Sequence, residues 1–358
     1  MDNIKDGDWK KYDVENLWFD IDYGIVSGGM RPAFDLKKAP YPDNTIFKDS
    51  NFLFPYMDNV HRRGSIQFSR GCPYSCSYCI NGFYRDNFKG LGYNVRTKDQ
   101  HFVINEMLKL KYNYRVESLR FHDETFLALP RKYFDSVASE YIKYIKLPFT
   151  IETTANLISD ERVATLKDMG CTSVSVGVET SNEHLRRNIL KKNVTNEQYI
   201  KAFDILKKYN IRKVANFMYF LPHQTIDDMY KDILFAKECD IDSANANIFY
   251  PYQGTPLRKY CIENELINNA AIAEFENEDK IKSLDDLENS PIVYDGTVLN
   301  FSEGEKEAGL RYLDNFSLLQ ALPVVMHKPV MELIKSNNIN TLNEIKEKVY
   351  AEKFGVCN

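Results

Sequence analysis

Short apolar runs alternate with longer amphipathic stretches along the middle of the chain, from about residue 64 to residue 250. This alternation predicts six strands, over residues 65–69, 118–122, 149–153, 173–178, 212–220 and 243–250. Repeated strand and helix units build parallel sheets, because each helix returns the chain to the same edge of the sheet. We therefore expect an α/β fold, a partial (β/α)6 barrel of the TIM type.

Capping residues mark the ends of several helices between these strands. Helices are expected over residues 99–110, 131–145, 159–170, 195–209 and 225–238. Ser159 and Thr195 are N-cap candidates, and Gln198 completes a capping box with Thr195. Gly170 is a C-cap candidate, because glycine adopts left-handed backbone angles without strain.

The 358 residues fit one large barrel better than two separate domains, because the predicted strands share one alternating pattern. Residues 1–63 are expected to form an N-terminal extension or linker, and residues 64–267 the barrel. Residues 268–358 are expected to form a C-terminal, mostly helical region.

Charge and hydropathy exclude several classes of protein. Lysine and arginine total 46 against 51 aspartate and glutamate residues, a formal net charge of −5. Proteins that bind nucleic acid usually present a strongly positive face, so this balance argues against such a partner. No apolar run reaches the roughly 18 to 20 residues that span a bilayer, and the first residues lack the pattern of a secretory signal. We expect a cytoplasmic protein with no membrane partner.

Three of the seven cysteines lie within eight residues, in the segment SRGCPYSCSYCI. Cys72, Cys76 and Cys79 have the spacing C-x3-C-x2-C, directly after the first predicted strand. The other four are scattered singly, at positions 171, 239, 261 and 357. Three thiolates this close can converge on one metal centre without closure of a long loop.

Several kinds of site are compatible with three clustered thiols. Three thiolates and one open position suit a 4Fe-4S cluster whose fourth iron takes an external ligand. Alternatives are a zinc site with His122 as a distant fourth ligand, a disulfide with one thiol left over, and chance clustering of structural cysteines.

The cysteine spacing, with Tyr78 just before the last cysteine, resembles the radical S-adenosylmethionine (SAM) superfamily. The resemblance implies a 4Fe-4S cluster on Cys72, Cys76 and Cys79, with SAM bound to the open iron. It implies reductive cleavage of SAM to a 5′-deoxyadenosyl radical that abstracts hydrogen from an unactivated carbon of a small-molecule substrate. It also implies a flavodoxin- or ferredoxin-type electron donor, and places Tyr78 at the adenine of SAM.

Further segments resemble the cobalamin-binding branch of the same superfamily. They read FHDETFL, GVETSNEHLRRNILKKN, FLPHQT and YPYQGTPL, and a linker-like DLKKAPYPDNTIF precedes the barrel. The residues before that linker are too few for a cobalamin domain. We expect a fragment, one half of a split system, or a relative that works without cobalamin. Cobalamin would then come only from a missing or separate cobalamin-binding domain.

Carboxylates end three of the predicted strands, where a barrel site would need them. Asp123 and Glu124 follow the second strand, and Glu152 and Glu179 end the third and fourth. By resemblance these four would contact SAM, although Asp123 and Glu124 could equally cap a turn. Arg186, in a basic run that otherwise suggests a solvated helix face, is a further SAM candidate for its carboxylate. No residue stands out as catalytic.

One segment departs from the family pattern. Relatives have Gly-Leu-Pro-Gly-Glu-Thr after the fifth strand, where this chain has Phe220 to Thr225. Phe220 and His223 replace the two glycines, which is expected to remove positive backbone φ angles and add bulk near the site mouth.

The reaction class stays open within this resemblance. Methyl transfer is expected if a cobalamin partner exists. The alternatives are a cobalamin-independent epimerase, dehydrogenase or rearrangement enzyme, and a non-catalytic iron-sulfur protein. An RNA-modifying enzyme is disfavoured by the acidic balance.

Overall fold

The structure is a computed structural model that describes residues 15–21, 24–56, 59–92, 95–268, 270, 272–273, 296–336 and 338–354. Cys357 lies outside the described residues.

A seven-stranded curved sheet forms the centre of the molecule, with strand order β11-β10-β9-β8-β7-β4-β3. Its strands are β3 (Leu53–Tyr56), β4 (Asn59–Ile66), β7 (Ser118–Phe121), β8 (Phe149–Thr153), β9 (Cys171–Glu179), β10 (Arg212–Tyr219) and β11 (Ser243–Ile248). The six strands from β4 to β11 pair in parallel, and β3 is an antiparallel edge strand on β4. The partial barrel expected from the alternation is confirmed.

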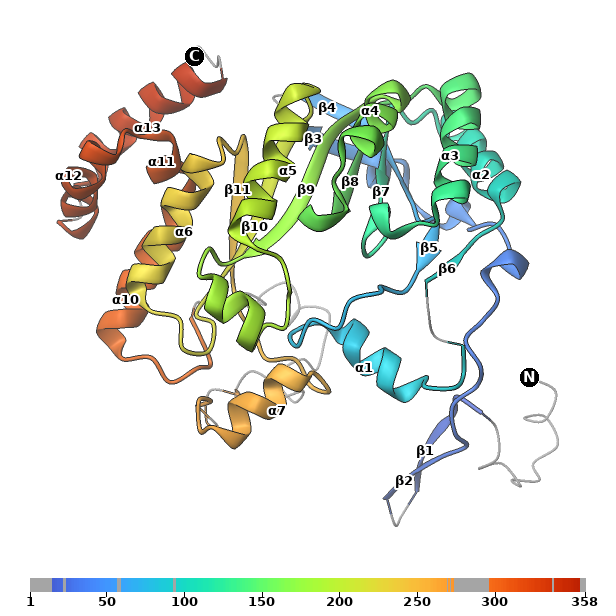
Figure 1. Cartoon of the computed structure of the whole chain (residues 1–358), viewed down its shortest axis with the longest axis horizontal. Coiled ribbons are helices and arrows are strands. Elements are labelled where there is room, and N and C mark those ends of the chain that lie inside the picture. Colours follow the sequence, from blue (N-terminus) through green and yellow to red (C-terminus); the bar gives the residue numbers. More distant parts are fainter. Residues whose placement is uncertain are drawn as a thin grey trace.

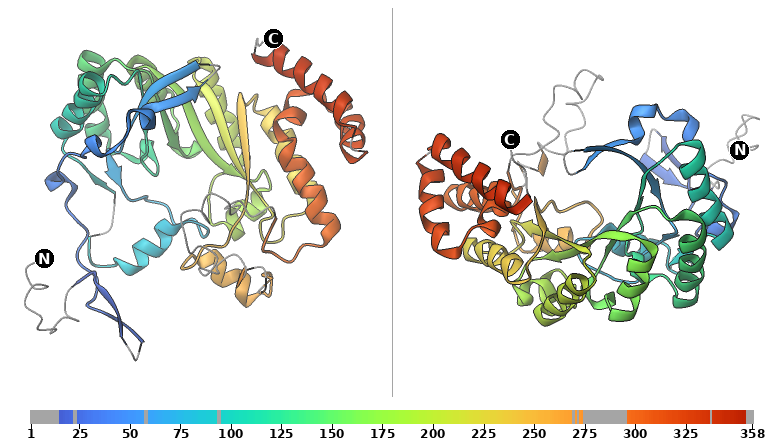
Figure 2. Two further views of the ribbon diagram at one scale, coloured as in Figure 1. Left: turned by 180° about the vertical axis from the view of Figure 1, so that it is seen from behind. Right: turned by 90° about the horizontal axis from the view of Figure 1, so that it is seen from above.

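Helices cover the convex face of the sheet, as the view from above shows (Figure 2). They are α2 (Gln100–Asn113), α3 (Arg131–Glu140), α4 (Asp160–Met169), α5 (Asn196–Lys208) and α6 (Ile226–Glu238). Their expected caps are confirmed. Ser159 accepts from the backbone N–H of Arg162, Thr195 forms a capping box with Gln198, and Gly170 has a left-handed φ of 96°.

Alternation along the strands separates an apolar outer face from a polar inner face. In β10 every second side chain is buried, and the residues between them are half-buried. The outer set packs under the helices, where Phe121 stacks on Phe149 and Tyr141 meets both rings edge-to-face. The inner set includes Ser175 and Asn216, which leaves the concave face polar. A complete barrel fills this space with branched apolar side chains, and this half-barrel does not.

The first barrel strand begins earlier than the sequence predicts. The alternation places it over residues 65–69, but β4 spans Asn59–Ile66. Its middle carries Arg62 and Arg63, which mask the apolar alternation in the sequence. Ser69–Arg70 instead forms β5, which pairs in antiparallel fashion with β6 (Arg96–Thr97).

The remaining elements lie around the sheet (Figure 1). β1 (Trp18–Ile21) and β2 (Gly24–Ser27) form a hairpin in the N-terminal extension, α1 (Ile80–Asn87) follows the cysteine loop, and α7 (Pro256–Glu263) follows β11. After it come α10 (Glu303–Asp314), α11 (Phe316–Ala321), α12 (Val324–Lys335) and α13 (Ile339–Phe354). Among the described residues, no helix is both long and apolar enough to cross a bilayer.

Candidate active site

The three clustered cysteines lie on the loop between β5 and α1. Gly71 opens the loop at a φ of 97°, a left-handed conformation that favours glycine. Cys79 is the N-cap of α1, and its backbone N–H donates to the carbonyl of Cys76 at 3.1 Å. Ser77 fixes the middle of the loop, because its N–H donates to the carbonyl of Leu190 at 2.9 Å. The loop is thereby held against the segment after β9.

Asp123 holds the chain just before the cysteine loop through hydrogen bonds to its backbone. Its buried carboxylate accepts from the backbone N–H of Ser69 at 2.6 Å and from the N–H of Phe68 at 3.2 Å. Burial raises the pKa of Asp123 to about 6, and the hydrogen bonds from Ser69 oppose that rise. Asp123 does not line the cavity described next, so its contacts are those of a positioning residue.

One cavity of about 480 Å³ opens at the carboxyl ends of β7, β8 and β9. Its walls include all three cysteines and the polar ends of the three strands. The residues that matter for its chemistry are Cys72, Cys76, Cys79, Tyr78, Glu124, Glu152, Glu179 and Lys192. Four of the six SAM candidates, Tyr78, Glu124, Glu152 and Glu179, are thus brought together with the cysteines.

Each carboxylate in the cavity has a defined neighbour. Glu124 accepts from the backbone N–H of Gly71 at 3.2 Å, which ties it to the cysteine loop. Glu152 forms an ion pair with Arg120 on the neighbouring strand β7. Glu179 ends β9 with a left-handed φ of 69°. A non-glycine residue in that conformation costs of order 1 to 3 kcal/mol, and such strain gathers at functional sites.

Glu179 lies between a phenol and an ammonium group. Tyr78 donates its hydroxyl to Oε1 of Glu179 at 2.9 Å. Lys192 donates from Nζ to the same oxygen at 2.8 Å and to the carbonyl of Gly177 at 2.6 Å. Burial alone lowers the pKa of Lys192, but the charge and hydrogen bond of Glu179 together with the charges of Tyr199 and Cys76 leave the pKa raised. Burial, and then the charge of Glu179, raise the pKa of Tyr78 well above its usual range.

Lys192 is the residue of this site that the sequence did not single out. It belongs to the basic run that suggested a solvated face, yet it is 9% exposed, whereas Lys191 beside it is exposed. Both lysines line the cavity, and the side chain of Lys192 turns back to donate to Glu179. No periodicity in the sequence carries that information.

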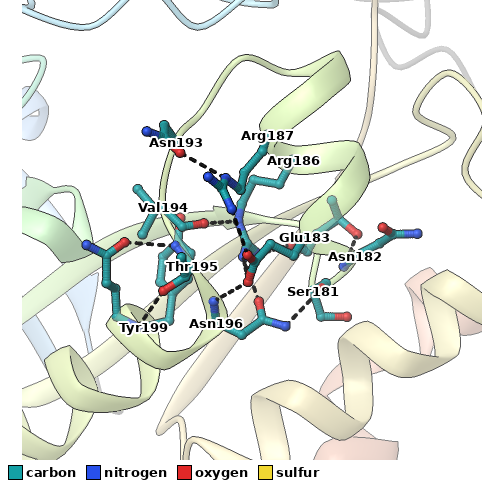
Figure 3. Close-up of polar contacts among 12 residues, drawn as sticks. Ser181, Asn182, Glu183, Arg186, Arg187, Asn193, Val194, Thr195, Asn196 and Tyr199 are labelled. Atoms are coloured by element: carbon teal, nitrogen blue, oxygen red, sulfur yellow. Dashed lines mark hydrogen bonds and ion pairs between the residues drawn. The ribbon is translucent and has the colours of Figure 1, made fainter.

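Arg186 is fully buried and does not line the cavity. Its guanidinium donates to the carbonyl of Val194 at 2.9 Å and to Oδ1 of Asn196 at 2.6 Å, as Figure 3 shows. It also donates to the carbonyl of Thr180 at 2.5 Å. Thr180 follows Glu179, and Val194 lies two residues after Lys192. Arg186 therefore clamps the two chain segments that carry the Glu179–Lys192 pair, and the geometry gives it this positioning role in place of a SAM contact.

A polar network continues from the cavity down the concave face. Asn216 donates to Oγ of Ser175 at 2.9 Å, and Asn245 donates to Oδ1 of Asn216 at 3.3 Å. On the other side, Nε2 of His122 lies 3.2 Å from Oγ of Ser65. The side chains of Asn245, His122 and Ser65 are exposed. The inner wall thus presents hydrogen-bonding groups to any molecule that enters the half-barrel.

The loop after β10 was expected to lose positive φ angles and to add bulk at the site mouth, and the structure contradicts both expectations. Phe220 and His223 keep left-handed φ angles of 61° and 64°, although neither is glycine. Phe220 is fully buried and packs edge-to-face against Phe301, so it adds bulk to the core and not to the site mouth. His223 is exposed, and its Nε2 lies 2.8 Å from the hydroxyl of Tyr260 on α7. Packing holds the strained backbone that glycine would adopt freely.

The donor set suits an iron-sulfur cluster better than a single ion. Within the described ranges, no three His, Cys, Asp or Glu side chains are spaced to hold one metal ion. Zinc binds thiolate at about 2.3 Å, which draws its ligands together more tightly than a cubane does. His122 lies outside the walls of the cavity. This arrangement argues against the zinc alternative.

Comparison with known proteins is consistent with this geometry. Residues 66–236 match the family model of the radical SAM superfamily. The chain is 28% identical over 204 residues to an uncharacterized methyltransferase of Pyrococcus horikoshii, covering 57% of this chain and 43% of that protein. It is 30% identical over 201 residues to the FeFe hydrogenase maturase subunit HydE of Thermotoga maritima, covering 56% of this chain and 55% of HydE. The chain thus spans about half the length of these relatives.

A solved structure shares the fold. The radical SAM methyltransferase TsrM of Kitasatospora setae, with cobalamin and a 4Fe-4S cluster bound, aligns with a TM-score of 0.57 and 14% identity. The alignment covers 71% of this chain and 51% of TsrM. Fold, cysteine loop and family match agree, and residues 66–236 of this chain form a domain of the radical SAM superfamily.

Proposed function

We propose that the protein is a radical SAM enzyme that acts on a small-molecule substrate. Cys72, Cys76 and Cys79 would hold a 4Fe-4S cluster, and SAM would occupy the 480 Å³ cavity that these cysteines line. When bound and reduced, the cluster would supply one electron to SAM, which breaks a carbon-sulfur bond of SAM and yields methionine and a 5′-deoxyadenosyl radical for hydrogen abstraction. The observation that carries the proposal is the meeting of the three thiols with the acidic strand ends in one cavity.

The charges in the cavity suit the zwitterionic end of SAM. Glu124 and Glu179 provide carboxylates for its amino group, and Lys192 provides an ammonium for its carboxylate. Charge-assisted hydrogen bonds of this kind are stronger than neutral ones and fix the orientation of a ligand. Tyr78 lies beside them, with its hydroxyl held by Glu179. Its ring is the proposed neighbour of the adenine.

The concave face supports a polar substrate. Arg120 of β7 and Asn245 of β11 offer donors outside the SAM cavity, and Asn216 of β10 lines the cavity itself. A substrate on this wall would lie between the open side of the half-barrel and the proposed SAM site. Closure of the protein around the substrate would exclude water from the radical and prevent side reactions.

Methyl transfer is the second candidate outcome. The methyltransferase of Pyrococcus horikoshii and TsrM support it, since both share this domain. TsrM binds cobalamin, and the chain aligns with about half of it. Methyl transfer here would rest on a cobalamin-binding domain supplied separately or by a longer chain. A redox-neutral or dehydrogenating reaction is the alternative without one.

Reductive cleavage of SAM tests the proposal. The protein is reconstituted anaerobically with iron and sulfide, reduced, and given SAM, and 5′-deoxyadenosine is measured. We expect production by the native protein and none by Cys76→Ser. Cys239→Ala is the control, because Cys239 lies at the end of α6, away from the cavity. An intact cluster spectrum without 5′-deoxyadenosine from the native protein would favour the non-catalytic iron-sulfur alternative.

A further inference from the structure

A second cavity, of about 640 Å³, lies beside Gly71 at the start of the cysteine loop. It is lined by Arg31 of the N-terminal extension, Arg70 of β5, Arg96 of β6, Glu124 and two aromatic residues of α1 and its C-terminal end. Glu124 is shared with the proposed SAM cavity. The two cavities therefore adjoin at Glu124, and Gly71 of the cysteine loop lines the second.

The charge in this second cavity is strongly positive. Three guanidinium groups meet one carboxylate there. Arg70 and Arg96 are direct cross-strand partners in the two-residue ribbon of β5 and β6. Like charges directly opposite each other destabilise a strand pair, and an anionic partner relieves that cost. Among the described residues, Arg31 forms one loose ion pair, with Glu15 at 3.7 Å and with both side chains more than half exposed, so water screens it.

An apolar stripe joins the cavity to the cysteine loop. Ile80, Tyr84 and Phe88 recur every four residues from the start of α1, and they share one face of the helix. Ile80 is 39% exposed and Tyr84 is 42% exposed. Cys79, the proposed cluster ligand, is the N-cap of the same helix. An exposed apolar centre with a charged rim is the composition of a protein interface.

We propose that this surface, the cavity with Arg31, Arg70 and Arg96 and the adjoining α1 stripe of Ile80, Tyr84 and Phe88, docks a small acidic one-electron carrier protein. The proposal rests on the function proposed above, which requires a reductant. Acidic side chains of the carrier would meet the arginines, and its redox centre would face α1 and the cysteine loop. One electron leaves the carrier and enters the cluster, and it is consumed when the sulfur to C5′ bond of SAM breaks.

Charge complementarity favours an acidic protein as the partner of this surface. The chain as a whole is acidic, with a formal net charge of −5, so a cluster of three arginines is a local exception. Complementary charge steers encounter and raises association rates by about 10-fold to 1,000-fold at low salt. A transient redox partner needs such steering more than a large buried area, because weak electron-transfer interfaces are small.

The test compares two reductants on the same reconstituted protein. An acidic flavodoxin in its hydroquinone state is the protein probe, and reduced methyl viologen, a small cation, is the control reductant. The rate of cluster bleaching is followed for the native protein and for the double variant Arg31→Gln and Arg70→Gln. Arg311→Gln, on α10 away from this surface, is the matched control.

We expect the double variant to lose at least about tenfold in the flavodoxin rate at low salt, and to lose most of its salt dependence, because the steering charge is gone. Its rate with methyl viologen should stay close to the native rate. Equal flavodoxin rates for variant and native protein would overturn the proposal, as would an equal loss with both reductants. Tyr84→Ala, which removes no charge, should weaken flavodoxin binding and leave the methyl viologen rate unchanged.

Reduction of the cluster, seen as loss of its absorbance, does not depend on cleavage of SAM. The docking proposal and the proposed function can therefore fail separately. A cluster that flavodoxin reduces in an arginine-dependent way, without formation of 5′-deoxyadenosine, would contradict the proposed function and leave the docking surface standing. Binding of oxidised flavodoxin to the protein, measured by calorimetry, gives the same comparison without any reduction step.

Discussion

Lys192 donates a hydrogen bond from Nζ to Oε1 of Glu179 at 2.8 Å, and both side chains are almost completely buried. A buried ion pair stabilises little by itself, because desolvation offsets the attraction. The loss of one partner is costly, since it leaves the other charge buried alone. The pair is therefore sensitive to the loss of either partner.

Lys192→Met is expected to lower the free energy of unfolding by about 3 kcal/mol, because the carboxylate of Glu179 loses its counter-charge in a buried site. It should also weaken SAM binding to the reconstituted protein. Urea unfolding and equilibrium dialysis with SAM measure the two effects. Lys132→Met, on α3 and outside the cavity, is the matched control, and it should change neither quantity because Lys132 is exposed. Equal behaviour of the two variants would contradict the account of this pair.

Asp232 on α6 predicts a specific pH dependence of stability. It is fully buried and accepts a hydrogen bond from Oγ of Ser181 at 2.7 Å. Ser181 lies two residues after Glu179. Burial raises its pKa from the ordinary 3.8 to about 7. The folded protein then holds a proton that the unfolded chain releases between about pH 4 and pH 7, so this group's contribution to stability falls as the pH rises through that window. Asp232→Asn should remove that fall, as seen in urea unfolding across pH.

Asp228, on the same helix, is the control, because its pKa is shifted in the opposite direction. Although burial opposes the change, hydrogen bonds from Thr225 and Asn182 lower the pKa of Asp228 below its ordinary 3.8. Its stabilisation is present above that value and is lost as the pH falls below it. Asp228→Asn should therefore change the profile only on the acid side. If both variants shifted the profile in the same direction, the assignment of Asp232 would be wrong.

Gly309 on α10 leaves room for the strained loop after β10. A Cβ atom at this position would lie 2.5 Å from Cζ of Phe220 and 3.0 Å from Sδ of Met229. Phe220 is fully buried at a left-handed φ, so its ring has little freedom to move. Gly309→Ala should lower the free energy of unfolding by about 1 to 3 kcal/mol through overpacking.

Gly304, near the start of the same helix, supplies the matched control, because a Cβ atom at this position would have no neighbour within 4 Å. Gly304→Ala should be neutral or slightly stabilising, because alanine favours the helix. Thermal unfolding of the two variants side by side separates the packing effect from helix propensity. A stabilised Gly309→Ala would refute the close contact with Phe220.

The parts of the fold that could be predicted are those that local sequence determines. The capping box of Thr195 and Gln198, the C-cap Gly170 and the alternation in 149–153 depend on neighbours a few residues away. The start of β4 was missed, because its inner side faces the polar hollow of the half-barrel and carries Arg63. An open barrel interior weakens the apolar alternation from which strands are predicted.

The candidate site likewise has a part that the local sequence predicts and a part that it does not. The cysteine spacing is local, and the chemistry of three close thiols could be inferred from it. The burial of Lys192 and Arg186 could not, because it depends on hydrogen bonds to Gly177 and Thr180 across a turn of the chain. The left-handed angles at Phe220 and His223 were also beyond reach, since packing against Phe301 and α7 imposes them.

The electron paramagnetic resonance spectrum of the reduced, reconstituted protein tests the central claim most directly. The claim is that Cys72, Cys76 and Cys79 hold a 4Fe-4S cluster with one iron open to SAM. We predict about four irons and four sulfides per chain and a reduced-cluster signal whose g-values shift when SAM is added. Cys72→Ser, Cys76→Ser and Cys79→Ser should each lose that signal. A signal that SAM leaves unchanged, or one that survives loss of these cysteines, would contradict the account.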